Sequence, residues 1–213
     1  MTTAAQANFD GTAVDAFRDV PLLPHPTGGA GAVRSLSVSG TLHRSGGLTV
    51  EFRLAAEMRA IRLAPSVCRP HRRDELWRHT CFELFARCGS EPRYCEFNFS
   101  PSGDWAAYAF DEYRGLRRDT GQRASDVTVQ TTGLEQIQLR GRVDLRSAFV
   151  MDTASLEIAS WRLNCAAVIE AMDGSLTYWA VHHPRAQPDF HDAGGFRIGM
   201  CDAHPLGGAP VAQ

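Results

Sequence analysis

The sequence contains no lysine. All 22 of its basic residues are arginine, in a chain of 213 residues that carries 24 acidic residues and a net charge of −2. Without lysine there is no Schiff-base nucleophile and no phosphate-loop lysine, which excludes pyridoxal-dependent enzymes and Walker-type nucleotide hydrolases. A net charge so close to zero also predicts no nucleic acid or other polyanion as a partner.

Signals for secretion, membrane insertion and metal binding are missing as well. The N-terminus has no basic region followed by an apolar run, and no apolar window approaches the roughly 20 residues of a membrane span. The cysteines form no C-x-x-C pair and have no metal-type spacing with histidine. We therefore expect a cytoplasmic protein without membrane contact, whose thiols are reduced. They are Cys68, Cys81, Cys88, Cys95, Cys165 and Cys201.

Long segments with helical periodicity are absent too, and short alternating runs take their place. Between residues 48 and 54, Leu48, Val50, Phe52 and Leu54 alternate with polar residues, which is typical of a half-buried strand. Many such runs at hairpin spacing predict an all-β fold, an antiparallel β-sandwich of immunoglobulin-like or jelly-roll-like architecture. Besides the central segment described next, strands are expected at residues 32–43, 48–54, 58–63, 127–132, 134–144, 156–163, 165–172 and 176–181.

The domain organisation expected from this pattern is simple. A loop-rich N-terminal extension covers residues 1–31 and a ligand-binding sandwich covers residues 32–200. A flexible, glycine-rich tail covers residues 201–213. One β domain is a common solution at this length.

The chain is organised around residues 76–110, which predict a three-strand antiparallel meander. In its first strand Phe82 and Leu84 point to one side and Glu83 to the other. In its second strand Glu96 and Asn98 share a side opposite to the neighbouring cysteine and phenylalanines. If the two strands are neighbours, a row of polar side chains follows one face of the sheet.

Two interpretations of this polar row stay open. Carboxylates, an amide and aromatic rings on one face are what a concave ligand site tends to use. Alternatively, Glu83 and Glu96 pair with arginine and only hold the sandwich together, because a buried carboxylate must find a partner whatever its role.

A family resemblance rests on three motifs in this order. The pattern L-W-x-H-T-C-F-E-L-F, followed by Y-x-E-F-N-F-S-P-S-G-x-W-A-A-Y, resembles the bacterial DOMON-like domains. These domains are related to family 9 carbohydrate-binding modules and to haem- or sugar-binding DOMON domains. The resemblance spans roughly residues 53–196, and the third motif, near its C-terminal end, also resembles the end of such domains. It reads Tyr178-Trp179-Ala180, His182-His183-Pro184 and Pro188-Asp189-Phe190-His191.

The resemblance implies a non-catalytic module that binds a small polar ligand, and a saccharide fits the residues best. Sugar rings stack on indole faces, while carboxylates, amides and guanidinium groups bind hydroxyls. We expect no cofactor and leave the oligomeric state open. Trp105 and Trp161 are interpreted as core residues. The candidate ligand-binding residues are Trp77, His79, Glu83, Glu96, Asn98, Arg162, Asn164 and Trp179.

Four alternatives remain. Haem could be held by a histidine with Met58 or Met151, although C-x-x-C-H is absent. Glu83 and Glu96 could act as a glycosidase pair, but no other catalytic motif accompanies them, so a binding protein is expected rather than an enzyme. A protein-interaction sheet face is the third alternative. A metal site is the fourth, with ligands drawn from His182, His183 and His191.

Overall fold

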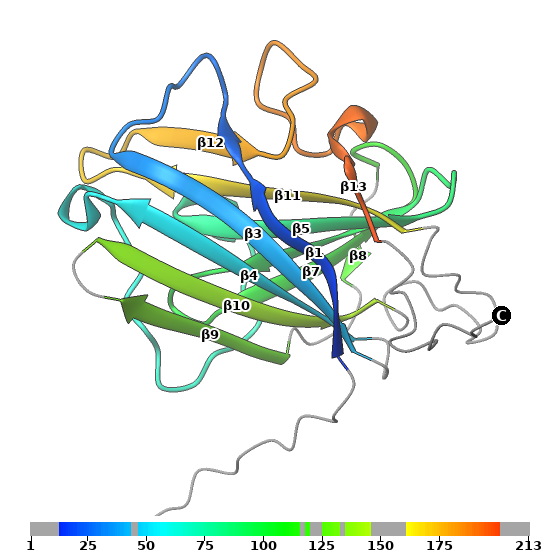
Figure 1. The fold of residues 1–213 in the computed structure, drawn as a ribbon, viewed down its shortest axis with the longest axis horizontal. Helices are drawn as coiled ribbons and strands as arrows, with labels where there is room; N and C mark the ends of the chain where they lie inside the picture. Colours follow the sequence, from blue (N-terminus) through cyan, green and yellow to red (C-terminus); the bar gives the residue numbers. More distant parts are fainter. Residues whose placement is uncertain are drawn as a thin grey trace, which may run out of the picture.

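Two antiparallel sheets pack face to face, which confirms the all-β sandwich (Figure 1). The computed structural model describes residues 13–43, 47–115, 118–119, 125–132, 135–145 and 161–200. The sheet in front in Figure 1, called sheet A, has the strand order β1-β3-β4-β10-β9. Its strands are β1 (Ala13–Pro21), β3 (Val33–His43), β4 (Gly47–Ala56), β10 (Gln136–Asp144) and β9 (Ser125–Thr132).

Sheet B lies behind sheet A and contains the predicted meander at its centre. Its order is β2-β12-β11-β5-β6-β7-β8, and β13 pairs with β11. Short 3-10 turns lie at Met58–Ala60, Leu76–Arg78 and Ala193–Gly195. In the part of the chain that the structure describes, no helix is long and apolar enough to cross a membrane. The strands of sheet B are β2 (Leu23–Pro24), β12 (Leu176–Ala180), β11 (Trp161–Glu170), β5 (Cys81–Cys88), β6 (Tyr94–Phe99), β7 (Trp105–Phe110), β8 (Arg118–Asp119) and β13 (Ile198–Gly199).

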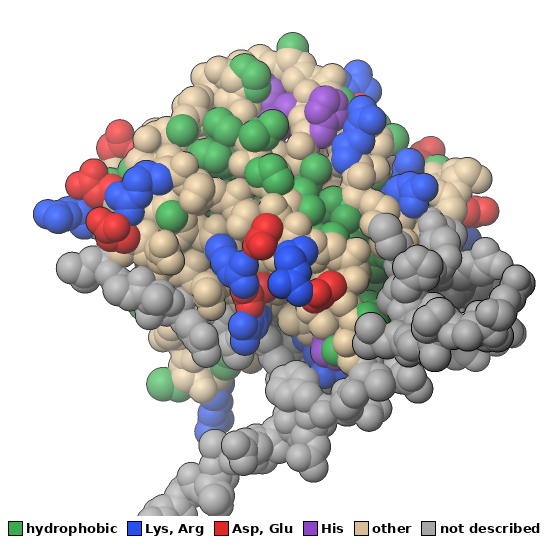
Figure 2. All heavy atoms as spheres, in the orientation of Figure 1, with side chains coloured by type: hydrophobic (Ala, Val, Ile, Leu, Met, Phe, Trp, Pro, Cys, Tyr) green, Lys and Arg blue, Asp and Glu red, His purple; other side chains and the backbone are tan. Residues whose placement is uncertain are grey.

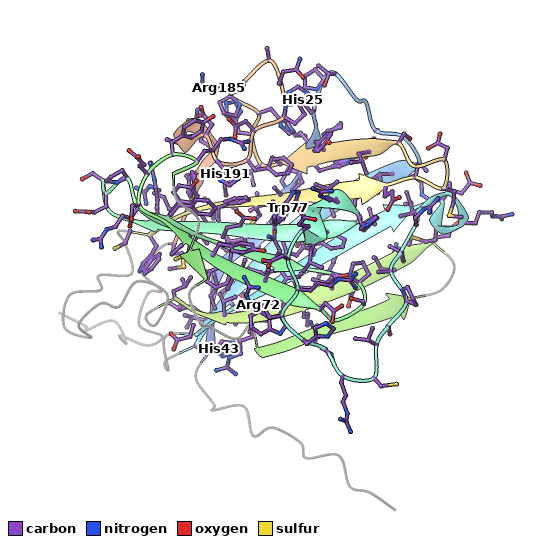
Figure 3. All side chains as sticks on the ribbon, turned by 180° about the vertical axis from the view of Figure 1, so that it is seen from behind. His25, His43, Arg72, Trp77, Arg185 and His191 are labelled. Carbon is purple, nitrogen blue, oxygen red and sulfur yellow. The ribbon has the colours of Figure 1, made fainter. Side chains whose placement is uncertain are left out.

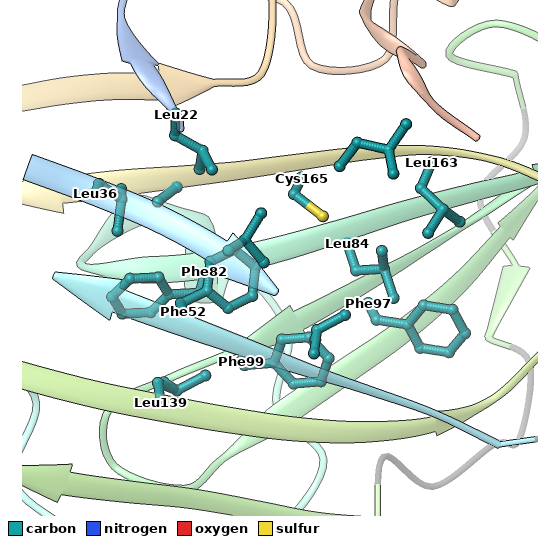
Figure 4. Close-up of a cluster of buried hydrophobic side chains, with 14 of the residues drawn as sticks. Leu22, Leu36, Phe52, Phe82, Leu84, Phe97, Phe99, Leu139, Leu163 and Cys165 are labelled. Carbon is teal, nitrogen blue, oxygen red and sulfur yellow. The ribbon is translucent and has the colours of Figure 1, made fainter. Parts of the chain in front are cut away.

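The main hydrophobic core fills the space between the sheets (Figure 4). Alternate residues of β5 and β6, among them Phe82 and Phe99, point into it and are fully buried. Phe52 of β4 meets Phe82 from the opposite sheet, with ring centroids 5.2 Å apart. Phe99 lies over Gly141 of β10, where a Cβ would come within 2.5 Å of its ring. The odd and even positions of β5 and β6 therefore face two different surroundings, as the alternation predicted.

Three sequence-based expectations differ from the structure. Residues 13–21 form β1, which pairs with β3, so part of the expected N-terminal extension belongs to the sandwich. Residues 58–63 form a 3-10 turn and an isolated bridge at Ile61 in place of a strand. The residues from 161 to 170 are one continuous strand, β11, where two strands were expected. A hairpin turn was expected at residues 45–47, of which Gly47 begins β4 and the other two lie outside the described residues. The tail at 201–213 also lies outside the described residues.

The outer face of sheet A is covered by ion pairs. Arg53 contacts both Asp19 and Glu51, and Arg140 reaches Glu51 from the next strand. Figure 2 shows positive and negative side chains interspersed at this place. Exposed pairs of this kind contribute little to stability and keep the face hydrated. The outer face of sheet B differs in kind, because aromatic rings cover much of it.

Candidate functional site

A cavity of about 520 Å³ lies on the outer face of sheet B. Strands β5, β6, β7, β11 and β12 form its floor, and segments around residues 77, 114 and 190 cover it. His191 and Trp77 both lie over the sheet face turned to the viewer in Figure 3. The lining residues are Trp77, Arg78, Glu83, Glu96, Phe110, Arg114, Gly115, Val168, Leu176, Tyr178, Pro188, Phe190 and His191.

Two carboxylates lie on the cavity floor. Asn98 pairs with Glu83 across β5 and β6, and Phe85 pairs with Glu96, so the two glutamates are diagonal neighbours. Glu83 is 3% exposed and Glu96 is 5% exposed. Burial and, to a lesser extent, the charge of Glu96 raise the pKa of Glu83 well above its ordinary value. The Oε1 atom of Glu83 is buried and has no hydrogen-bond partner.

Asn98 lies behind Glu96 and does not line the cavity. Its side-chain amide donates to Oε1 of Glu96 at 2.7 Å. Its carbonyl oxygen accepts a weak S–H bond from Cys81 at 3.8 Å. A fully buried amide with both ends engaged fixes the orientation of the carboxylate that it contacts. The amide therefore acts on the cavity through Glu96.

His191 closes one side of the cavity as a neutral imidazole. Its Nδ1 is 2.8 Å from the hydroxyl of Tyr94, whose oxygen also accepts the backbone N–H of Arg114. The tyrosine O–H is thus directed at Nδ1, which assigns the ring hydrogen to Nε2, 3.8 Å from Oε2 of Glu96. Burial and then the charge of Arg114 lower the pKa of His191 to about 4, against a smaller opposing effect of Asp189.

Replacing Tyr94 by phenylalanine is expected to destabilise the protein by about 1–3 kcal/mol, because the backbone N–H of Arg114 and Nδ1 of His191 lose their partner. Denaturant unfolding measures the loss, and nitrogen NMR shifts of His191 report the tautomer. Tyr178→Phe removes the same hydroxyl from another cavity residue and is expected to cost less than about 0.5 kcal/mol. Equal costs for the two variants would contradict the hydrogen-bond assignment.

The segments that cover the cavity are tied together at Asp189. Its carboxylate accepts from the guanidinium of Arg114 at 3.0 Å and from the hydroxyl of Tyr113. It also accepts the backbone N–H of His191 at 3.1 Å. Burial alone would raise the pKa of Asp189, but the bonds from Tyr113 and Arg114 outweigh it and lower the pKa. This ionised carboxylate holds residues 113–114 against residues 189–191.

The sequence-predicted residues separate into two groups. Trp77, Glu83 and Glu96 come together at the cavity, with Asn98 directly behind. Asn164 is fully buried and donates to the carbonyl of Phe190 at 3.0 Å, so it anchors the covering segment without lining the cavity.

His79, Arg162 and Trp179 do not line the cavity. Nδ1 of His79 is 2.8 Å from Oε2 of Glu170, outside the cavity. Arg162 is exposed at the start of β11. Trp179 faces the core between the sheets, and its indole N–H donates to Thr177. The prediction that Trp179 is a ligand-binding residue is corrected here, because strand alternation directs the preceding residue, Tyr178, to the cavity instead.

Sequence reasoning missed most of the covering and wall residues. Phe110 pairs with Tyr94 across β6 and β7, and Tyr178 pairs with Val168 across β11 and β12. Once the register is known, alternation places both rings on the cavity face. His191 had a signal of its own, because it ends the motif at residues 188–191 that resembled the DOMON-like domains.

The histidines named as metal ligands lie apart. Nε2 of His183 is 2.8 Å from the carbonyl of Leu23, whereas His191 faces the cavity. Among the described residues, no three His, Cys, Asp or Glu side chains are grouped to hold a metal ion. Met58 packs against the inter-sheet core, and Met151 lies outside the described residues. The five described cysteines are free thiols.

Fold and site together define an antiparallel β-sandwich with a ligand-sized cavity on one outer face. The same fold occurs in a crystal structure of a "putative carbohydrate-binding protein" from Bacteroides uniformis ATCC 8492, with a TM-score of 0.53 and 14% identity. The match covers 83% of this chain and 84% of that chain. Similarity at this identity establishes the fold alone. No protein-family model and no curated protein matches the sequence.

Proposed function

We propose that this protein binds a saccharide, or a similar small polar ligand, in the cavity on sheet B and does not transform it. The observation that carries the proposal is the pairing of aromatic walls with two buried carboxylates in a space of about 520 Å³. Small-molecule sites have this composition, with mostly apolar walls and a few convergent polar groups.

The geometry suits a sugar ring in particular. Trp77 and Tyr178 line the cavity, and the C–H surface of a pyranose would pack against their rings. Ligand hydroxyls would donate to the carboxylate of Glu96 and accept from the Nε2–H of His191. Because a carboxylate only accepts and this imidazole nitrogen donates, the site addresses both functions of a hydroxyl group.

Two further facts support the proposal. The neighbour of similar fold carries a carbohydrate-binding name. The motifs in residues 76–110 resemble the DOMON-like domains, which include sugar binders. Relationship to those domains and to family 9 modules, and a cytoplasmic location, are parts of the proposal.

The test is a thermal-shift screen of the purified protein against monosaccharides and oligosaccharides. A ligand that binds the native state raises the melting temperature by mass action. Glu96→Gln is expected to abolish the shift while the protein stays folded, and Asn98→Ala to weaken it through Glu96. Glu51→Gln removes a matched carboxylate from the ion pairs on sheet A and is expected to keep the shift. A shift that survives Glu96→Gln would place binding elsewhere.

Haem is the second candidate, because His191 presents one imidazole to the cavity. Haemin therefore belongs in the same screen. A melting-temperature rise with haemin alone, together with a visible absorption band that His191→Ala removes, would replace the saccharide proposal.

A further inference from the structure

A second, smaller cavity of about 260 Å³ lies beside the first on the outer face of sheet B. His191 lines both cavities, so the two spaces meet at one side chain. Figure 3 shows Arg185 and His191 of this lining in the same part of the molecule. Arg87, Asp192 and Phe196 line the second cavity but not the first.

The guanidinium of Arg87 is the group of this cavity that can donate to a ligand. Its Cζ lies over the ring of Phe196, 5.1 Å from the centroid. Its Nε is buried and has no hydrogen-bond partner, and none of the residues that the structure describes accepts a hydrogen bond from its terminal nitrogens. The five N–H donors of a guanidinium lie in its plane, so a ring packed against its face leaves them available.

The other charged side chains of the lining contact each other. Nε of Arg185 donates to Oδ2 of Asp192, and Oδ1 of Asp192 accepts the backbone N–H of Gly194 at 2.7 Å. A ligand in the second cavity therefore meets its hydrogen-bond donors at Arg87. A carboxylate matches a guanidinium with two parallel N–H···O bonds. A phosphate dianion would bring a second negative charge close to Asp192, which favours the singly charged carboxylate.

A second arginine lies next to Arg87 on the sheet. Arg162 of β11 is directly opposite Arg87 in the pairing of β5 with β11. Opposed residues of an antiparallel pair share a face, and like charges at such positions repel each other. An anion bound at Arg87 reduces this repulsion. The position of Arg162 thus adds to the attraction for an anion, although Arg162 does not belong to the cavity lining that is described.

We infer that the second cavity is a carboxylate-binding site, in which the guanidinium of Arg87, held against Phe196, binds the ligand. The carboxylate belongs either to a separate small acid or to an acidic sugar whose ring occupies the first cavity. Arg87 and Glu96 are diagonal neighbours on β5 and β6, about 7–8 Å apart at Cα, so the two cavities are close enough for one ligand. The inference itself does not require saccharide binding, because it concerns a different cavity.

The experiment is an NMR titration of the purified protein at pH 7 with four probes: benzoate, glucuronate, glucose and inorganic phosphate. Glucuronate and glucose share the pyranose ring and differ in the carboxylate, whereas benzoate is a carboxylate without hydroxyls. The signal observed is the Nε–H resonance of Arg87, which is identified by its absence from Arg87→Lys. Glucuronate is expected to shift this resonance and to bind at least about tenfold more tightly than glucose or phosphate, which corresponds to about 1.4 kcal/mol.

Three variants locate the effect, with affinities taken from the backbone amides of residues 192–196. Arg87→Gln is expected to weaken carboxylate binding at least about tenfold, and Arg87→Lys to weaken it less, because lysine keeps the charge but not the planar pair of donors. Arg93→Gln removes a nearby arginine that pairs with Glu91 and lies outside the described lining, and is expected to keep the affinity. Melting curves confirm that each variant is folded.

The outcomes also separate the two sources of the carboxylate. Benzoate that binds as tightly as glucuronate supports a site for a separate acid, and tighter binding of glucuronate supports an acidic sugar. Binding of neither overturns the inference and leaves the saccharide proposal to its own screen. Phosphate or glucose that binds as tightly as glucuronate overturns the carboxylate as the ligand class. Carboxylate binding that survives Arg87→Gln overturns the assigned position.

Discussion

Phe82→Ala is expected to lower the free energy of unfolding by about 3–5 kcal/mol, which is a large share of the stability of a domain. Phe82 is fully buried where the two sheets meet, and its ring packs against Phe52 of sheet A. Truncation removes buried apolar surface and leaves a cavity between sheets whose strands cannot move together without breaking their pairing. Urea unfolding of both proteins measures the difference.

Leu23→Ala is the matched control for this truncation. Leu23 is 54% exposed at the edge of sheet B, so its loss is expected to change the free energy of unfolding by less than about 0.5 kcal/mol. Similar costs at both positions would show that the core does not lie between the sheets.

Between pH 6.5 and 8, stability is expected to fall with rising pH as far as the raised pKa of Glu83, by up to about 1.4 kcal/mol per pH unit. Between its ordinary pKa of 4.5 and its raised native pKa, Glu83 is ionised in the unfolded chain and protonated in the native protein, because burial and, to a lesser extent, the charge of Glu96 raise the native pKa. The native state then binds more protons than the unfolded state, so each increase in pH favours unfolding.

His191 has the opposite effect at lower pH. Between its native pKa of about 4 and its ordinary value of 6.5, the unfolded chain binds the extra proton, so stability rises with pH. The two effects oppose each other below pH 6.5, and only that of Glu83 remains above it. The range ends at pH 8, below the ordinary value of 9.0 for thiols such as that of Cys95, whose pKa burial raises to about 12.

Glu83→Gln is the variant that tests this assignment. It is expected to melt at a higher temperature than the parent protein at pH 8, and to lose the decline between pH 6.5 and 8. His191→Gln is expected to keep that decline and to be less sensitive to acid between pH 4 and 6.5. A decline that persists in Glu83→Gln would assign it to another group.

The sequence predicted the floor of the site better than its walls. Period-2 alternation in β5 and β6 is a local property, so Phe82 and Glu83 could be assigned to opposite faces without a structure. For Trp179 the alternation alone is not sufficient. Which side chains of β12 point to the cavity depends on the register between β12 and β11. The sequence shows only that Tyr178 and Trp179 face opposite sides of the sheet, and it is Tyr178 that lines the cavity.

The covering segments could not be predicted from local pattern at all. His191 reaches the cavity because Asp189 binds Arg114, a residue 75 positions away in the chain. Loop conformations of this kind depend on contacts between distant segments, and no periodicity encodes them. The neutral state of His191 follows from the same contacts and from burial, so it too required the folded structure.

Alternate side chains of β5 and β6 point into the core, and the others point to the cavity. These strands therefore tolerate insertions and deletions far less than substitutions. Deleting one residue within β5 would shift every following side chain to the opposite face. Phenylalanine would then enter the cavity and glutamate the apolar core, so both structure and site would be lost together. Insertions and deletions are therefore confined to the connections, and the floor of the site can change only by substitution.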